Sequence, residues 1–251
     1  MKTIIAGSRI LTSEKLVRKA IKEAKKQGIN ITEVVSGTAR GVDSIGASIA
    51  KQYGIPVSEF PANWNKHGKS AGYIRNSEMA EYADALIAVY DGSSAGTRHM
   101  INIATATNLP KYIHKTEYKY FDESKYVEYL FDYQVFVFGS NEAGRHGSGA
   151  AKTAIDKFGA IYGQGIGMTG NKCYGIPTKN QFIRSLTIDK IRLYVYDFIS
   201  FAKANPNKEF IVTKIGCGLA GFKDEQIAPM FKGSPTNCVF SNDWIDYLED
   251  V

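Results

Sequence analysis

The sequence predicts an α/β protein of two three-layer domains, each built on a mostly parallel sheet. Short apolar runs alternate with amphipathic segments of helical length along most of the 251 residues. The alternation occurs twice, on either side of a stretch rich in Tyr, Lys, Glu and Asp. Strands that alternate with helices need crossover connections, and such connections produce parallel sheets covered by helices.

Residues 1–115 form the first predicted domain. Its strands are expected at 2–6, 33–36, 56–60, 84–90 and 110–114, and its helices at 13–27, 43–53, 73–82 and 97–108. The lysines between Lys15 and Lys26 have the spacing of a solvated helix face. Asp43 is expected to cap the helix that follows it. This order favours a doubly wound sheet.

Residues 116–132 are predicted to be a linker with a short helix, and residues 133–251 to be the second domain. Strands are expected there at 134–138, 173–177, 209–214 and 237–240, and helices at 150–158, 187–204, 223–231 and 242–249. A glycine-rich segment, 159–178, separates the first helix from the following one. The architecture of the first half therefore recurs without a fixed-period repeat.

The composition limits the environment and the partners. The formal charge of +6 and the pI of about 9.0 suit an anionic small molecule. No zinc knuckle or dense arginine stripe is present, which argues against nucleic acid as the partner. The three cysteines lack metal or disulfide spacing, and no stretch has the length of a signal or membrane span. We expect a cytoplasmic protein that needs no cofactor and binds no metal or membrane; self-association stays open.

Glycine and hydroxyl residues follow three of the predicted strands in the first domain. Parallel strands end at one edge of their sheet, and the helix that follows a strand attracts phosphate to its first turn. The predicted nucleotide site contains Gly7, Ser8, Arg9, Ser36, Gly37, Gly41, Asp43, Arg75, Asn76, Asp91, Gly92, Ser93, Gly96 and Thr97. The alternative is that these glycines only form tight turns. The loop at 63–69 contains an aromatic residue and cations, as a base-stacking lid would.

The first domain resembles the SLOG superfamily, the Rossmann-like group that includes DprA and the lonely-guy phosphoribohydrolases. The resemblance lies in Gly7-Ser8-Arg9, Ser36-Gly37, Gly41-Val42-Asp43, Arg75-Asn76, Ala83-Asp84-Ala85, and Asp91-Gly92 with Gly96-Thr97. It implies the binding of nucleotides or nucleotide-derived signals. The catalytic branch has PGGxGTxxE, but here Met100 stands in place of the glutamate. Binding is therefore expected in this half rather than cleavage of the N-glycosidic bond.

The second domain resembles a divergent macro domain. Its predicted binding residues are Asn141, Gly144, Arg145, Gly147, Ser148 and Gly149 in a first loop, and Gly216, Cys217, Gly218, Leu219, Gly221 and Phe222 in a second. The resemblance implies that both loops wrap a diphosphate and that Phe222 stacks on a ribose or base. His146 is the candidate catalytic acid or base; the alternative is a hydrogen bond only. The upstream segment whose aspartate reads adenine is expected to be absent.

These features predict a protein that binds nucleotides derived from NAD or ADP-ribose, to sequester or process a nucleotide signal. The pairing of the two modules resembles phage proteins and would suit counter-defence. The first alternative is a hydrolase of an N-glycosidic or ADP-ribosyl bond that needs His146 or Arg75. A weaker alternative is single-stranded DNA binding of the DprA kind.

Overall fold

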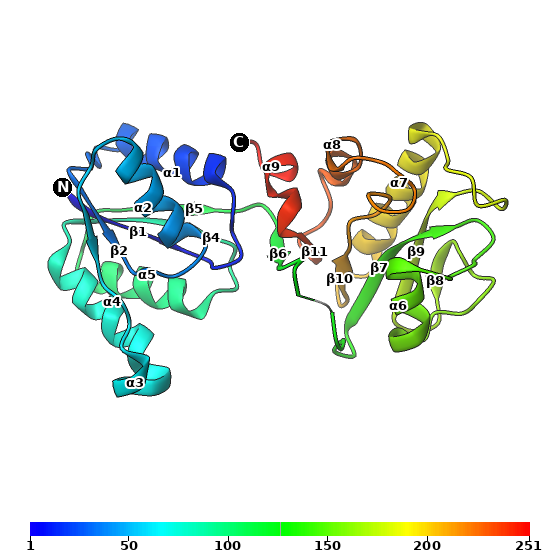
Figure 1. Ribbon diagram of the computed structural model, residues 1–251, viewed down its shortest axis with the longest axis horizontal. Coiled ribbons are helices and arrows are strands. Elements are labelled where there is room, and N and C mark those ends of the chain that lie inside the picture. The colour runs from blue at the N-terminus through cyan, green and yellow to red at the C-terminus, as the bar shows by residue number, and fades with distance from the viewer. Residues whose placement is uncertain (126) are drawn as a thin grey trace. The chain divides into compact units, whose positions relative to one another are not determined.

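The chain forms two compact α/β units, which are described separately. The computed structural model describes residues 1–125 and 127–251 (Figure 1). Met1–Lys119 form the first unit and Tyr120–Asp250 the second. Tyr126, within the predicted linker, lies outside the described residues. Among the described helices, none combines the length and the apolar character that crossing a membrane requires.

The first unit contains a five-stranded sheet in which all neighbouring strands are parallel. The strands are β1 (Lys2–Gly7), β2 (Glu33–Ser36), β3 (Val57–Glu59), β4 (Ala85–Tyr90) and β5 (Lys111–Lys115), in the order β3-β2-β1-β4-β5. The longer helices are α1 (Glu14–Lys26), α2 (Val42–Gln52), α4 (Ala71–Tyr82) and α5 (Ala95–Ala106). Figure 1 shows α1 and α2 on one face of the sheet and α4 and α5 on the other. The predicted doubly wound sheet is confirmed.

Two local details of this unit differ from the sequence-based expectations. The predicted cap Asp43 lies inside the first turn of α2, and Gly41, with a φ of 77°, is the N-cap residue. Asp43 is buried, so its carboxylate serves the interior of the fold instead of the helix end. The loop after β3 contains the short helices α3 (Trp64–His67) and η1 (Gly68–Ser70). The side chain of Asn63 accepts a hydrogen bond from the Lys66 amide and thereby starts α3.

The second unit contains a six-stranded mixed sheet. Its strands are β6 (Lys119–Phe121), β7 (Gln134–Asn141), β8 (Gly167–Thr169), β9 (Cys173–Lys179), β10 (Glu209–Val212) and β11 (Cys238–Ser241), in the order β6-β11-β10-β7-β9-β8. Strands β11, β10, β7 and β9 pair in parallel, and β8 is antiparallel to β9. The helices are α6 (Gly149–Phe158), α7 (Ile188–Ala204), α8 (Asp224–Ile227) and α9 (Ile245–Leu248), with η2 (Ala228–Phe231) and η3 (Asn242–Trp244) beside them.

The predicted linker contributes a strand to this sheet. Residues 119–121 form β6 in place of the expected short helix, and Tyr120 is buried. Aromatic residues favour a pleated, half-buried position, which explains the strand. The helix predicted at 223–231 divides into α8 and η2 at Pro229, and the one at 242–249 divides into η3 and α9.

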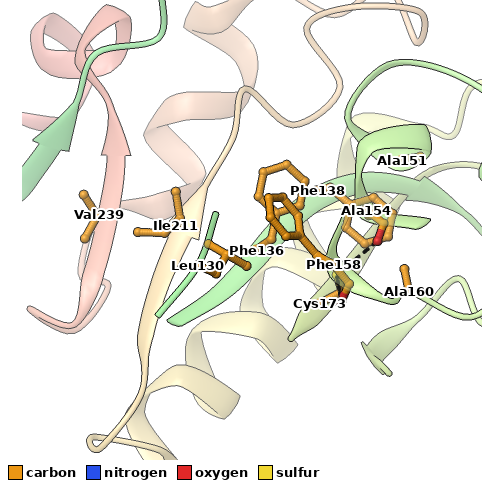
Figure 2. Packing of buried hydrophobic residues seen from close by; sticks show 10 residues of the cluster. All are labelled: Leu130, Phe136, Phe138, Ala151, Ala154, Phe158, Ala160, Cys173, Ile211 and Val239. Atoms are coloured by element: carbon orange, nitrogen blue, oxygen red, sulfur yellow. Dashed lines mark hydrogen bonds between the residues drawn. The ribbon is translucent and has the colours of Figure 1, made fainter. Parts of the chain in front are cut away.

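Alternating residues of β7 and β10 fill two apolar layers, one on each face of the second sheet. Figure 2 shows the first layer, in which Phe136 and Phe138 contact Phe158 of α6 and Cys173 of β9. In the second layer Phe198 of α7 is fully buried among aromatic rings. It meets Tyr174, Phe210 and Phe231 with ring centroids 5.2, 5.5 and 6.1 Å away. These two layers hold β7 and β10 in the middle of the sheet.

We predict that Phe198→Ala lowers the free energy of unfolding of the second unit by about 3–5 kcal/mol. The substitution removes a buried ring and leaves a cavity among the neighbouring aromatic side chains. Urea unfolding followed by the fluorescence of the buried Trp244 measures this loss, in a chain whose other tryptophan is replaced (Trp64→Phe). Phe182→Ala removes a ring that is 72% exposed and is the matched control. Equal stability of the two variants would contradict the prediction.

Candidate functional site

The first unit has two adjoining cavities at the carboxyl edge of its sheet, with volumes of about 410 and 270 Å³. Arg9, Trp64 and Arg75 line both cavities. The larger cavity reaches the start of α5 at Ser93, Ser94, Ala95 and Gly96, and the smaller one reaches Gly37, Thr38, Ala39 and Arg40. Cations and a tryptophan therefore face the edge where phosphate was expected.

Asp91 joins two of the loops at this edge. Its buried carboxylate accepts hydrogen bonds from the Ser8 hydroxyl at 2.6 Å and from the Ser93 amide at 3.1 Å. The Ser93 hydroxyl donates a third hydrogen bond at 2.5 Å. The Asp91 carboxylate thus accepts hydrogen bonds from within the protein and connects the loops after β1 and β4 to each other.

The guanidinium of Arg75 forms an ion pair with Asp43. The Arg75 Nη1 atom lies 3.6 Å from the Asp43 carboxylate and donates to the Gly37 carbonyl. A β-carbon at Gly37 would overlap Arg75, which explains the glycine. Burial raises the pKa of Asp43 to about 6, although Arg75 and the Gly7 amide oppose this. Burial also lowers the pKa of Arg75. The pair positions a cation beside both cavities.

The first turn of α5 is fixed by side chains of its own and of α4. Ser94 caps the helix by accepting from the Thr97 amide at 3.3 Å and from the Thr97 hydroxyl at 3.0 Å. Asn76 donates to the Gly96 carbonyl at 3.1 Å and meets the ring of His99 at 3.3 Å. Met100 is fully buried in the core, and Glu78 and Glu81 are exposed. No carboxylate therefore stands at the position where the catalytic SLOG branch has its glutamate.

The predicted residues of the first unit fall into two groups. Those that line the cavities are Ser8, Arg9, Gly37, Arg75, Asn76, Ser93 and Gly96. Those that do not are Gly7, Ser36, Gly41, Asp43, Asp91, Gly92 and Thr97; they shape the loops. Gly7 shows why, because a β-carbon there would overlap the Val89 carbonyl of the neighbouring strand.

The second unit has a cleft with two lobes at the carboxyl edge of its sheet. We call the cavity of about 390 Å³ that is lined by Lys179, Ile183 and Leu219 the β9 lobe. The cavity of about 450 Å³ lined by Phe121, Glu123 and Val127 is the β6 lobe. Both lobes share a floor formed by Gly149, Ala150, Thr213, Lys214 and Gly218. The two predicted loops therefore meet at one place, the floor between the lobes.

The floor presents the start of α6. The residue before this helix, Ser148, makes no side-chain hydrogen bond to the first turn, and Gly149 has a φ of 57°. Gly149, Ala150 and Ala151 line the β9 lobe. Opposite them the second loop turns at Gly216, whose φ is 74°. Because the first amides of a helix have no partner within the helix, they are available to a ligand here.

The first predicted loop, which follows β7, packs against the backbone of the glycine-rich segment after α6. The Asn141 side chain accepts from the Arg145 amide at 2.9 Å and donates to the Arg145 carbonyl at 2.7 Å, which closes the loop. The Gly163 amide donates to the Gly144 carbonyl at 2.9 Å. A β-carbon on Gly144 would overlap Gly163, and one on Gly165 would overlap the Asn141 carbonyl. The loop and the glycine-rich segment after α6 therefore touch without side chains between them.

His146 lies under this loop and lines neither lobe. It is 3% exposed, its Nε2 atom is 3.1 Å from the Gln164 carbonyl, and its ring meets Phe138 edge-on at 5.1 Å. Its Nδ1 atom is buried without a partner among the described residues. This placement is that of a residue that supports the loop. The alternative considered for His146, a hydrogen bond to the backbone, is what the structure shows.

Charged groups in the β6 lobe form a network. Lys214 bridges Asp224 at 2.9 Å and Asp243 at 3.0 Å. Burial lowers the pKa of Lys214, but these carboxylates outweigh it and raise the pKa above its ordinary value. Burial raises the pKa of Glu123, whose Oε2 atom has no hydrogen-bond partner among the described residues. Glu123 follows β6, within the predicted linker.

Cys217 is not prepared for nucleophilic chemistry. Burial raises the pKa of its thiol to about 12, and its sulfur lies 3.4 Å from the Ile215 carbonyl. Within the part of the chain that the structure describes, no three side chains of His, Cys, Asp or Glu gather as metal ligands.

Most of the predicted residues of the second unit line the cleft. They are Asn141, Arg145, Gly147, Ser148, Gly149, Gly216, Cys217, Gly218 and Leu219. Gly144, Gly221 and Phe222 line neither lobe; the Phe222 amide donates to the Gly216 carbonyl, and stacking by the Phe222 ring stays a prediction. Glu123, Lys179 and Lys214 were missed. Lys179 is the last residue of β9 and Lys214 lies two residues after the end of β10, and strand ends were the available signal.

The raised pKa of Asp43 predicts a pH-dependent stability of the first unit. The folded state holds the proton more tightly than the unfolded chain, so this contribution is full below about pH 4 and is lost as the pH rises through about 6. The loss should be on the order of 2–3 kcal/mol. Urea unfolding at several pH values should show this slope in the natural protein and not in Asp43→Asn. Glu59→Gln, which removes an exposed carboxylate, is the control, and a slope that persists in Asp43→Asn would contradict the assignment.

Comparison with known proteins identifies relatives of the chain. Residues 1–67 match the model of the YspA, cpYpsA-related SLOG family. The "Gene 61 protein" of Mycobacterium phage D29 is 35% identical over 115 residues, which cover 43% of this chain and 92% of that protein.

Two solved structures are also similar, each with a TM-score of 0.35. A protein of unknown function from Bacteroides thetaiotaomicron is 19% identical and aligns with 49% of this chain and 95% of its own. Thermosipho africanus DarTG in complex with ADP-ribose is 13% identical, with 59% of this chain and 55% of its own covered. The chain belongs to the family of the phage Gene 61 protein, and its first unit is a SLOG domain.

Proposed function

We propose that the second unit binds ADP-ribose or a closely related NAD-derived nucleotide, and that the first unit binds a phosphorylated nucleoside. The observation that carries the proposal is the cleft of two lobes with a shared floor of helix start and glycine loop. A nucleoside diphosphate sugar has the matching order of parts, a ring system at each end and two phosphates between them. The volumes of both lobes lie in the range of small-molecule sites.

The diphosphate belongs on the floor. The first amides of α6 carry the positive end of the helix dipole, and Gly218 leaves the opposite wall free of side-chain atoms. Lys214 lies on the floor and stays protonated, because its two carboxylate partners raise its pKa. Backbone donors and a cation together suit two adjacent phosphates.

The base belongs in the β6 lobe. Phe121, Val127 and Phe136 supply its apolar walls, and Glu123 supplies a polar group whose Oε2 atom lacks a partner among the described residues. An exocyclic amino group, such as that of adenine, would satisfy this oxygen. The ribose beyond the diphosphate then reaches the β9 lobe, where Arg145 and Lys179 provide donors for its hydroxyls.

Binding without turnover fits these sites better than hydrolysis. His146 is buried below the loop, the Cys217 thiol has a raised pKa, and Met100 occupies the position of the SLOG glutamate. A protein with two such sites would sequester a nucleotide signal. The phage relative supports counter-defence as the setting.

The first unit offers a smaller site of the same kind. Arg9 and Arg75 face the start of α5, where a phosphate would meet both a cation and the helix dipole. Trp64 lines both cavities and is 52% exposed, so its ring is available to a base. In the segment 63–69, where a lid was expected, Trp64 of α3 thus provides an aromatic wall of both cavities.

Two glycines provide a paired test of both sites. Gly218 and Gly96 lie in the walls of their cavities, have no atom within 4 Å of an added β-carbon and are free of positive φ values. A leucine fits at either position without strain and fills the cavity. We predict that Gly218→Leu weakens ADP-ribose binding in calorimetry by more than about tenfold, or at least about 1.4 kcal/mol, whereas Gly96→Leu leaves it unchanged.

The roles should reverse for AMP at the first unit, so each variant is the control for the other. Mass analysis of the ADP-ribose recovered after denaturation should return the intact mass. A shifted mass would replace sequestration by hydrolysis, and unchanged affinity in Gly218→Leu would remove the cleft from the function.

Glu123 gives a second test of the base-binding lobe. We predict that Glu123→Ala lowers the affinity for ADP-ribose by about tenfold, because the amino group of the base loses its acceptor, the buried Glu123 Oε2 atom. Glu128→Ala removes an exposed carboxylate from the same segment and should have no effect. If the two variants bind equally, Glu123 does not contact the base.

A further inference from the structure

We propose that Ile183 determines specificity in the β9 lobe, as an apolar wall that a strained backbone holds against the group beyond the diphosphate. This inference rests on the proposed function of the second unit. It concerns the part of the ligand that distinguishes ADP-ribose from ADP.

Ile183 has a backbone conformation that its side chain disfavours. Among the described residues, three other than glycine have positive φ values: Thr38 at 57°, Asn108 at 54° and Ile183 at 65°. Asparagine enters this region readily, whereas a β-branched residue there is a genuine outlier. Asn108 lies outside the cavities described above, but Thr38 lines the smaller cavity of the first unit and Ile183 lines the β9 lobe. Strain of this kind persists where the surroundings enforce it, commonly at binding sites.

The loop after β9 enforces the conformation with four hydrogen bonds. The Asn180 side chain accepts from the amides of Phe182 at 2.9 Å and Arg184 at 3.1 Å. The Asn180 amide donates to the Arg184 carbonyl at 2.8 Å, and the Ile183 amide donates to the Asn180 carbonyl at 3.0 Å. The Ser185 hydroxyl donates to the Ala220 carbonyl at 2.9 Å and ties this loop to the glycine loop across the cleft.

These hydrogen bonds fix the loop so that the Ile183 side chain lines the cleft. Ile183 lines the β9 lobe together with Leu219, whereas the neighbouring Phe182 lines neither lobe. Arg145 and Lys179 are the cations of the same lobe. The lobe thus combines an apolar wall with polar donors. This suits a sugar ring, which presents C–H groups on a face and hydroxyls at its edge.

A truncated ligand isolates this contact. ADP ends at the diphosphate and does not reach Ile183, whereas ADP-ribose carries the ring that does. We expect Ile183→Gly to weaken ADP-ribose binding by about five- to tenfold, the loss of part of one buried apolar contact, and to leave ADP binding unchanged. The melting temperature should not fall, because glycine adopts the positive φ without strain.

Two further variants distinguish the loss of the apolar Ile183 contact from an increase in the flexibility of the loop. Ile183→Asn tolerates the same backbone but is polar, so it should lose ADP-ribose affinity as Ile183→Gly does, with less added freedom. Phe182→Ala changes the same loop outside the cleft and should bind both ligands normally. Calorimetry on the full chain with ADP and ADP-ribose measures all of these.

An unchanged ADP-ribose affinity in Ile183→Gly, or an equal loss for ADP, would overturn the role of Ile183 while the proposed function stands. Failure of the natural protein to bind either ligand would overturn the proposed function itself, and the inference with it.

Discussion

Parallel strand pairing is the constraint on which both units depend. It places the carboxyl ends of neighbouring strands at one edge, so each strand must turn within a few residues into the helix that follows. The turn into α6 has a glycine at positive φ, Gly149, and the helices that follow the strands leave their first amides without partners inside the helix, as at α5 and α6. Both candidate sites arise at that edge, one in each unit, from the same geometric cause.

Each site contains a cation whose charge is already balanced inside the protein. Arg75 pairs with Asp43, and Lys214 pairs with Asp224 and Asp243. Such partners fix the cation in one position, and they also moderate the field that a phosphate would feel. The sites therefore favour recognition by shape and directed hydrogen bonds over net charge.

The sequence predicted the fold because strand and helix patterns are local. The strand at 33–36 was predicted with the bounds that β2 has, and the glycine loops lie where expected. Side-chain direction was harder. Nothing near His146 in the sequence indicates that its ring lies under the loop, since that depends on Phe138 of β7 and on the Gln164 carbonyl of the glycine-rich segment. Glu123 was missed because β6 is short and joins β11, from the far end of the chain.

The contact of bare backbone between the Asn141 loop and the glycine-rich segment limits which positions of this site tolerate substitution. A β-carbon at Gly144 or Gly165 would overlap the backbone of the other segment. Neither segment can therefore accept a larger residue at these positions unless the other segment moves. Arg145 and Ser148 are exposed and line the β9 lobe, so substitutions there can alter the rim of the cleft while this backbone contact stays intact.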